Sequence, residues 1–148
     1  MIQRIQSIYL LLAAILMAVT AFSPILVLTE GLTLYSCGIS SLESEIVKPT
    51  WGIVSMALLS AILAFATIFF YKNRKKQMKM VSITVGVVLF YFVTAAVYLV
   101  SYFENVIQKI QMVDYGLFLP ILALVFLFLA KRGINKDEKL VRSTERIR

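Results

Sequence analysis

Few side chains in this sequence could carry out chemistry. The 148 residues include no histidine and one cysteine, Cys37. The commonest acid/base group and metal ligand is therefore missing, and no thiol pair can form within one chain. A serine–lysine dyad is the catalytic alternative left open. Its candidates Ser55, Ser60 and Ser82 lie inside apolar segments, whereas the lysines lie at the segment ends. We therefore expect no enzyme and no catalytic, cofactor-binding or metal-binding residue.

The elements that would have to position such groups are four apolar segments without any Asp, Glu, Lys, Arg or His. They are Ile8–Leu28, Trp51–Phe70, Met80–Phe103 and Tyr115–Ala130. About twenty apolar residues suffice for a helix to cross a bilayer, and 60% of the chain is hydrophobic. The sequence predicts an all-α membrane protein, a bundle of four transmembrane helices. Its membrane domain is residues 1–132, with spans at about 8–28, 51–71, 80–103 and 113–131.

The lack of ionisable residues in these segments also argues against several classes of membrane protein. Transporters and proton-coupled proteins generally place an ionisable side chain inside the bilayer, where function justifies its cost. The four apolar segments offer none, which argues against a small proton-coupled exporter. An intramembrane metalloprotease would lack its histidine ligands.

The positive charges predict the orientation. Tyr71–Lys79 carries five cations and no anion. With the N-terminus inside, the inner segments hold Arg4, these five cations and seven in the tail, which makes thirteen, and the outer ones hold Lys48 and Lys109. Because cytoplasmic loops are enriched in Lys and Arg, both termini are expected in the cytoplasm and residues 29–50 outside. The net charge of +7 thus reflects membrane topology, and no nucleic-acid partner is expected.

Two segments allow alternatives. Arg4 followed by an apolar stretch and small residues also resembles a cleaved signal peptide, but the apolar run continues to Leu28 and favours an uncleaved span. In the outer loop, Leu32–Tyr35 lies between Gly31 and Gly38, so a short strand or hairpin is possible there. Cys37 in this loop is interpreted as a free thiol, with an intermolecular disulfide as the alternative.

The C-terminal residues 133–148 are predicted to form a separate, short amphipathic cytoplasmic helix. Gly133 is suited to end the preceding helix, and Asn135 with Glu138 matches a capping box that starts a new one. The tail is basic and carries a narrow apolar stripe. It is interpreted as a helix on the surface of an anionic membrane, or alternatively as a docking helix for a cytoplasmic partner.

Both ends of the chain resemble a family of small bacterial four-span membrane proteins catalogued as a domain of unknown function. The resemblance rests on the opening Gln3–Ile15 (QRIQSIYLLLAAI) and the closing Lys136–Arg148 (KDEKLVRSTERIR). It implies a multi-pass protein of the bacterial inner (plasma) membrane with the same architecture. It implies no activity, cofactor or site residue.

The expected function is that of a non-enzymatic membrane protein that acts by association. Its expected partners are the lipid bilayer and either a membrane or cytoplasmic protein or further copies of the same chain. Small residues at helical spacing in the second and third spans, such as Ala57 and Ala61, favour close helix packing. The alternative is an oligomeric channel or a carrier of lipids or small molecules, with a polar path lined by Thr67, Ser82, Thr84 and Thr94.

Overall fold

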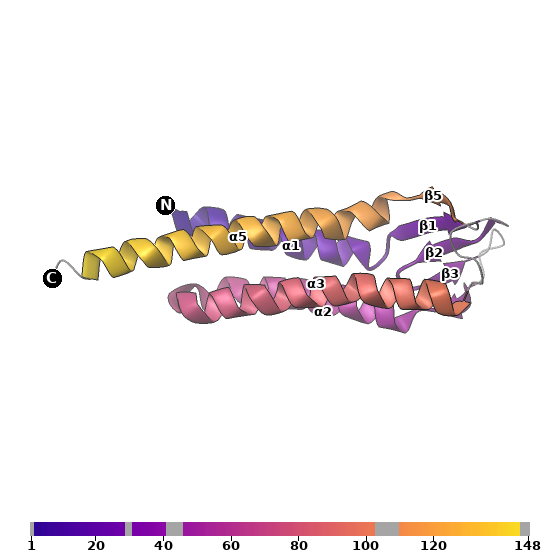
Figure 1. Cartoon of the computed structure of the whole chain (residues 1–148), viewed down its shortest axis with the longest axis horizontal. Coiled ribbons are helices and arrows are strands. Elements are labelled where there is room, and N and C mark those ends of the chain that lie inside the picture. Colours follow the sequence, from indigo (N-terminus) through magenta and orange to yellow (C-terminus); the bar gives the residue numbers. More distant parts are fainter. Residues whose placement is uncertain (1, 29–30, 41–45, 103–109, 146–148) are drawn as a thin grey trace.

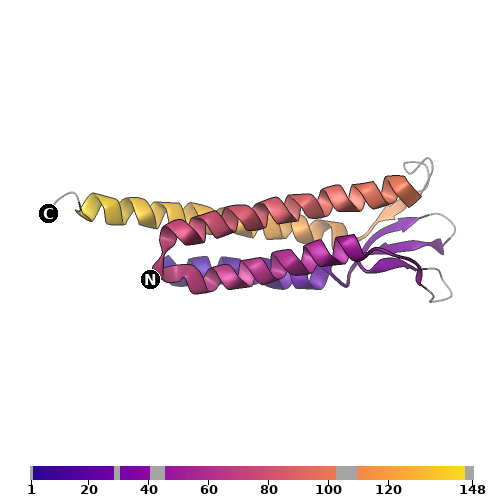
Figure 2. The same ribbon diagram turned by 90° about the horizontal axis from the view of Figure 1, so that it is seen from below.

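The computed structural model describes residues 2–28, 31–40, 46–102 and 110–145. Its main elements are four helices of alternating direction, α1 (Ile2–Thr20), α2 (Trp51–Phe69), α3 (Arg74–Tyr102) and α5 (Tyr115–Glu145). A 3₁₀ turn, η2 (Phe70–Lys72), joins α2 to α3. Figures 1 and 2 show a long bundle with a small β-sheet at one end and both chain termini at the other. We call these the sheet end and the basic end; the basic end holds η2, the starts of α1 and α3, and the last turns of α5.

A heptad pattern of buried residues holds the bundle together. Buried positions alternate in steps of four and three along every helix, the spacing that keeps one face toward a partner in a left-handed bundle. They are Gln6, Leu10, Ala13, Met17 and Thr20 in α1; Ile53, Ala57, Ser60, Ala64 and Thr67 in α2; Gln77, Val81, Thr84, Val88, Tyr91 and Ala95 in α3; and Gly116, Pro120, Ala123, Leu127, Ala130, Ile134 and Asp137 in α5.

The helices form a closed ring in the order α1, α2, α3, α5, and the contact between α3 and α5 is the least extensive of the four. Many core residues are small, which lets the helix backbones approach closely. The predicted packing role of Ala57 and Ala61 fits their burial. The outer surface of the bundle is apolar instead, with Phe90, Val97 and Phe128 each more than half exposed.

Within the described residues, three helices are long and apolar enough to cross a membrane: Trp51–Phe69, Arg74–Tyr102 and Tyr115–Val141. The apolar part of α1, Ile5–Thr20, is shorter. The predicted membrane character of the second, third and fourth segments is therefore matched by helices. The first segment differs from the prediction.

A strand replaces the last part of the predicted first span. Residues 8–28 were expected as one helix, but α1 ends at Thr20 and Pro24–Leu28 forms strand β1. Proline has no N–H to continue the helical hydrogen bonds. Just before it, the hydroxyls of Thr20 and Ser23 donate to the carbonyls of Leu16 and Val19 at 2.8 Å. The apolar residues of β1 are buried within the protein instead, Ile25 and Leu28 at 1% exposure.

The sheet has five antiparallel strands in the order β4-β3-β2-β1-β5. Between α1 and α2 lie β1, β2 (Thr33–Tyr35), β3 (Gly38–Ser40) and β4 (Ile46–Pro49). The expected short strand or hairpin of the outer loop thus corresponds to β2 and β3. The edge strand β5 (Ile110–Val113) lies between α3 and α5 in the sequence and pairs with β1, Val27 opposite Met112. The fold is therefore mostly helical with a small sheet, and the all-α prediction is wrong on this point.

Buried hydroxyl groups join the sheet to the helices. Ser36 Oγ donates to the carbonyl of Thr20 at 2.6 Å and lies 3.3 Å from the Tyr91 hydroxyl in α3. Thr50, next to the start of α2, donates to the carbonyl of Ser36 at 2.8 Å. Because a buried polar group costs free energy unless it is paired, these bonds fix the sheet on α1, α2 and α3.

The predicted separate tail helix is not what the structure contains. Helix α5 runs without a break from Tyr115 to Glu145, so Gly133 ends no helix and Asn135 starts none. The last turns of α5 continue along the bundle axis beyond the α2–α3 turn (Figures 1 and 2). A helix lying on the membrane surface would need to turn away from that axis. At the basic end, the continued helix packs closely against α1 at Gly133.

Candidate functional site

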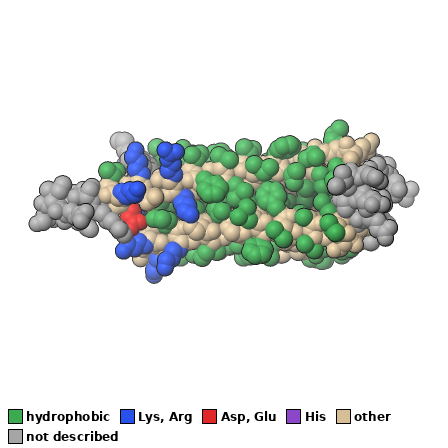
Figure 3. Space-filling view, in the orientation of Figure 1, with side chains coloured by type: hydrophobic (Ala, Val, Ile, Leu, Met, Phe, Trp, Pro, Cys, Tyr) green, Lys and Arg blue, Asp and Glu red, His purple; other side chains and the backbone are tan. Residues whose placement is uncertain are grey.

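The candidate site lies at the basic end, where the sequence places two groups of cations on facing helices. One group belongs to the first turns of α3 and the other to the second half of α5; their described, exposed or half-exposed members are Arg74, Lys75, Lys76, Lys79, Lys131, Arg132, Lys136 and Lys139. Figure 3 shows Lys and Arg side chains gathered toward one end of the visible face, with many apolar side chains along the middle of the bundle. The bundle thus separates charge from apolar surface along its axis.

A buried polar contact joins α1 to α5 at this end. Gln6 Nε2 donates to Asp137 Oδ2 at 2.7 Å, and both side chains are buried, at 5% and 7% exposure. They occupy the heptad positions just beyond Leu10 and Ile134. From α3, the guanidinium of Arg74 donates to the backbone carbonyl of Asp137 at 2.9 Å. Asp137 is therefore the point at which three helices are tied together.

Gly133 is a packing residue of this contact. A Cβ atom added at Gly133 would lie 2.9 Å from Gln6 Cγ and 3.2 Å from its Nε2, closer than side-chain carbons approach one another. Gly133 therefore leaves room for the Gln6 side chain to reach Asp137, one turn along α5. The prediction treated this glycine as a helix cap, although its place one residue before the buried Ile134 puts it beside the heptad stripe.

Polar groups continue across the basic end toward α2 and α3. The amide of Gln77 donates to the carbonyl of Thr67 at 3.4 Å, beneath the α2–α3 turn. A gap of about 10 Å³, enough for about one water molecule, lies here. It is enclosed by Gln6, Ser7, Tyr71, Arg74 and Gln77. The basic end is therefore closed by hydrogen-bonded side chains, and this gap is too small to admit a ligand.

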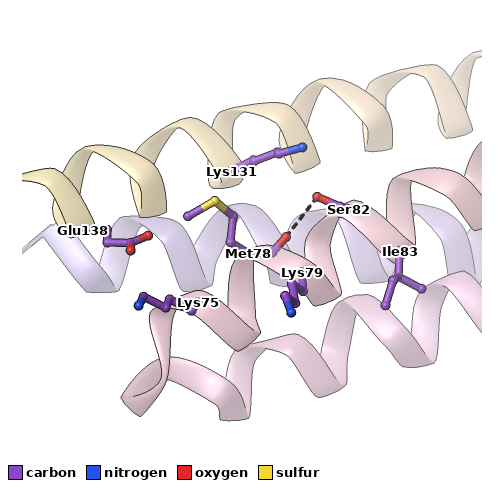
Figure 4. A pocket seen from close by; sticks show the side chains of 7 residues that line it. All are labelled: Lys75, Met78, Lys79, Ser82, Ile83, Lys131 and Glu138. Carbon is purple, nitrogen blue, oxygen red and sulfur yellow. Dashed lines mark hydrogen bonds between the residues drawn. The ribbon is translucent and has the colours of Figure 1, made fainter.

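A larger groove lies between α3 and α5, along the least extensive contact of the ring. Its volume is about 650 Å³, and it is lined by Lys75, Met78, Lys79, Ser82, Ile83, Lys131 and Glu138. Figure 4 shows the side chain of Met78 extending toward α5, and the bond that Ser82 donates to the carbonyl of Met78. The groove combines three ammonium groups and one carboxylate with apolar side chains.

A second groove, between α1 and α2, has a different character. It measures about 420 Å³, and all its lining residues are apolar: Leu11, Ala14, Ile15, Ala18, Leu58, Ala61, Ile62 and Phe65. It offers no group that could orient a polar ligand. Of these two grooves, the one between α3 and α5 is the better candidate for recognition.

The hydroxyls expected to line a polar path do not converge in this chain. Each donates to the carbonyl four residues earlier in its own helix: Thr67 to Leu63, Ser82 to Met78, Thr84 to Met80, and Thr94 to Phe90. Thr67 and Thr84 are buried in the core, whereas Ser82 lies on the outer surface. The candidate serines also stay within their helices, Ser55 bonded to Gly52 and Ser60 to Ala57.

The remaining chemically active residues lie apart from this site. Cys37 is exposed at the sheet end, as a free thiol. Within the described ranges, no three His, Cys, Asp or Glu residues lie close enough to hold a metal ion.

The role of Asp137 and the groove between α3 and α5 were not predicted from the sequence. The signal for Asp137 was the heptad stripe itself, which continues from Ala130 and Ile134.

Comparison with known proteins identifies the family. No curated protein and no solved structure matches the chain. One family model matches residues 2–147, nearly the whole length, and the match includes the opening and almost all of the closing segment on which the predicted resemblance rests. That resemblance to a family of unknown function is confirmed. The chain belongs to the family described as "Domain of unknown function (DUF4293)".

Proposed function

We propose that this chain is an integral protein of the bacterial inner membrane that spans it four times and acts by association with a protein partner. Its apolar outer surface and three helices of spanning length support the membrane part. The absence of histidine from the sequence, and the helix hydroxyls that bond back to their own helices, favour a role without catalysis.

The fourth span in this proposal is α1. Its apolar residues Ile5–Thr20 extend about 24 Å at 1.5 Å per residue, a few ångströms short of a typical hydrocarbon core. A bilayer adapts to such a mismatch by local thinning at modest cost. Because α1 lies between α2 and α5 in the ring and shares their core, it would cross the membrane with them.

The orientation follows from the basic end. Lys and Arg are enriched on the cytoplasmic side of membrane proteins, so we place this end, with both termini, in the cytoplasm. The sheet then lies outside. Trp51 starts α2 at the sheet end and is 74% exposed, and Tyr71 follows α2 at the basic end at 52% exposed. Trp and Tyr favour the two membrane interfaces, which fits this placement.

The observation that supports association is the exposed continuation of the α5 heptad stripe. Buried positions end at Asp137, and the next heptad position is Val141, which is 42% exposed. It lies on the arm, as we call residues 138–145 of α5, beside the exposed Lys139. A helix that presents an exposed apolar side chain beside a cation suits a partner with an apolar and acidic surface.

Site-specific photocrosslinking in living cells tests this role. With p-benzoylphenylalanine at position 141, we expect one adduct of defined mass, because the arm would hold its partner within reach of this side chain. The matched control carries the same group at Phe90, which is 63% exposed in the spanning part of α3. There we expect lipid adducts and no such protein.

The same experiment separates the possible partners. An adduct of twice the chain mass would mean that copies of this chain associate through the arm. The proposal fails if position 141 gives no protein adduct, or if both positions give the same set of adducts.

A further inference from the structure

We propose that the groove between α3 and α5 is a binding site for one anionic phospholipid, with the phosphate at the lysines and an acyl chain along α3. This inference rests on the membrane placement proposed above but does not depend on the partner of the arm. In the described part of the chain, this groove brings cations and exposed apolar side chains together. It lies between the two neighbouring helices of the ring that have the least extensive contact.

Charge selects the ligand. Lys75 and Lys79 lie one turn apart on α3, and Lys131 lines the same groove from α5. With Glu138, also on α5, the lining carries three positive charges and one negative, a net charge of +2. Such a site attracts an anion, because each lysine near a membrane surface favours an anionic lipid headgroup.

The apolar side of the groove selects a lipid over a free anion. Met78 and Ile83 line it together with the lysines, and Ile83 is 52% exposed. Ser82 and Gly86 follow Lys75 and Lys79 on the same face of α3, in heptad steps. Ser82 is exposed, and a Cβ added at Gly86 would meet nothing within 4 Å. This pair of small residues therefore leaves open space directly beyond the lysines.

Small residues at this spacing usually let another helix approach, but no helix within the described part of the chain packs against Gly86 closely enough to meet an added Cβ. The space runs from the charged end into the apolar surface of α3, in the direction that an acyl chain takes from its headgroup. An anionic lipid can bind the lysines with its phosphate and the apolar side chains with its acyl chain, whereas a free phosphate would bind the lysines alone.

The test measures lipid binding to the purified full chain by native mass spectrometry. The probes are phosphatidylglycerol and phosphatidylcholine with identical acyl chains, added separately at equal concentrations. The groove variant is Lys75→Gln/Lys79→Gln/Lys131→Gln. Its matched control, Lys76→Gln/Lys136→Gln/Lys139→Gln, removes the same charge from three exposed lysines at the same end that do not line the groove. Thermal unfolding checks that both variants are folded.

We expect the groove variant to weaken phosphatidylglycerol binding by about tenfold or more, and the control by less than about twofold. Phosphatidylcholine should bind more weakly than phosphatidylglycerol to the unchanged protein. Gly86→Leu keeps every lysine but fills the space beyond them, so it should also weaken phosphatidylglycerol binding. Inorganic phosphate at millimolar concentration should not displace the lipid.

Two results would overturn the proposal. Equal losses in the two triple variants would mean diffuse attraction to the whole basic end. Displacement by inorganic phosphate, together with no effect of Gly86→Leu, would mean a site for a free anion. The lipid test uses the isolated chain, whereas the crosslinking test detects a partner in the cell. A negative result in the lipid test therefore does not change the interpretation of an adduct at position 141.

Discussion

Replacing Gly116 by alanine is expected to destabilise the protein by about 3 kcal/mol, the upper part of the usual range for forced overpacking. Gly116 is the second residue of α5 and lies against the start of β1. A Cβ atom there would clash with the carbonyl oxygen of Pro24 and lie 2.8 Å from the carbonyl carbon of Pro24. Both are backbone atoms, so the clash can be relieved only by moving α5 away from the sheet.

The control is the same substitution at another helical glycine. A Cβ at Gly86 meets nothing within 4 Å, and alanine favours a helix over glycine by about 0.5–1 kcal/mol. Gly86→Ala should therefore be neutral or slightly stabilising. The measurement is unfolding of the purified protein in detergent, followed by the fluorescence of its one tryptophan. Equal stability of the two variants would show that α5 and β1 do not pack as described.

Removing the amide of Gln6 is expected to cost about 1.5–3 kcal/mol, the usual value of a hydrogen bond to a charged group. In Gln6→Leu, the carboxylate of Asp137 loses the donor at 2.7 Å and stays buried at 7% exposure. The cost arises mainly from the unpaired carboxylate, since leucine itself suits a heptad position next to Leu10.

The double variant Gln6→Leu/Asp137→Leu separates the lost hydrogen bond from other effects. It replaces both partners with apolar side chains at the layer beyond Leu10 and Ile134, and such replacements can be nearly neutral. We expect it to be more stable than Gln6→Leu, and the difference gives the coupling energy of the pair. If the costs of the two single variants simply add, the two side chains do not interact.

The helices of the second, third and fourth segments were predictable because one signal dominates them. Charge-free runs such as Trp51–Phe70 exclude most alternatives to a helix in a membrane. The cationic turn at Tyr71–Lys79 marks where two of these helices meet, and the structure places η2 and the start of α3 there. Hydrophobicity and charge suffice for this level of the fold.

The sheet was only partly predictable because strand β1 has the composition of a membrane span. Pro24–Leu28 is apolar, and a short apolar run does not distinguish strand from helix. What decides is tertiary pairing: β1 is hydrogen-bonded to β2 on one side and to β5 on the other. The partner β5 is more than eighty residues away, so no local pattern indicates the pairing.

The candidate site could not be predicted because one residue, Gly133, was interpreted wrongly. Gly133 matched a helix end by local rules, and that reading separated the tail from the bundle. With Gly133 taken as a contact with Gln6, the stripe of α5 runs on to Asp137, and Lys131 lines a groove together with Lys75 and Lys79 of α3. The composition of the groove was visible in the sequence, but the juxtaposition of Lys131 with Lys75 and Lys79 required the helix order around the ring.

The central claim, four crossings with the basic end in the cytoplasm, is tested most directly by labelling single cysteines. Cys37 is exposed at the sheet end and is the only cysteine in the sequence. Two further reporters are Gln3→Cys and Lys76→Cys, each in a Cys37→Ser background. A membrane-impermeant maleimide is applied to intact spheroplasts and to permeabilised ones. We expect Cys37 to react in both, and positions 3 and 76 only after permeabilisation. Reaction of position 3 in intact spheroplasts would show that α1 does not cross, and reaction of position 76 would contradict the orientation.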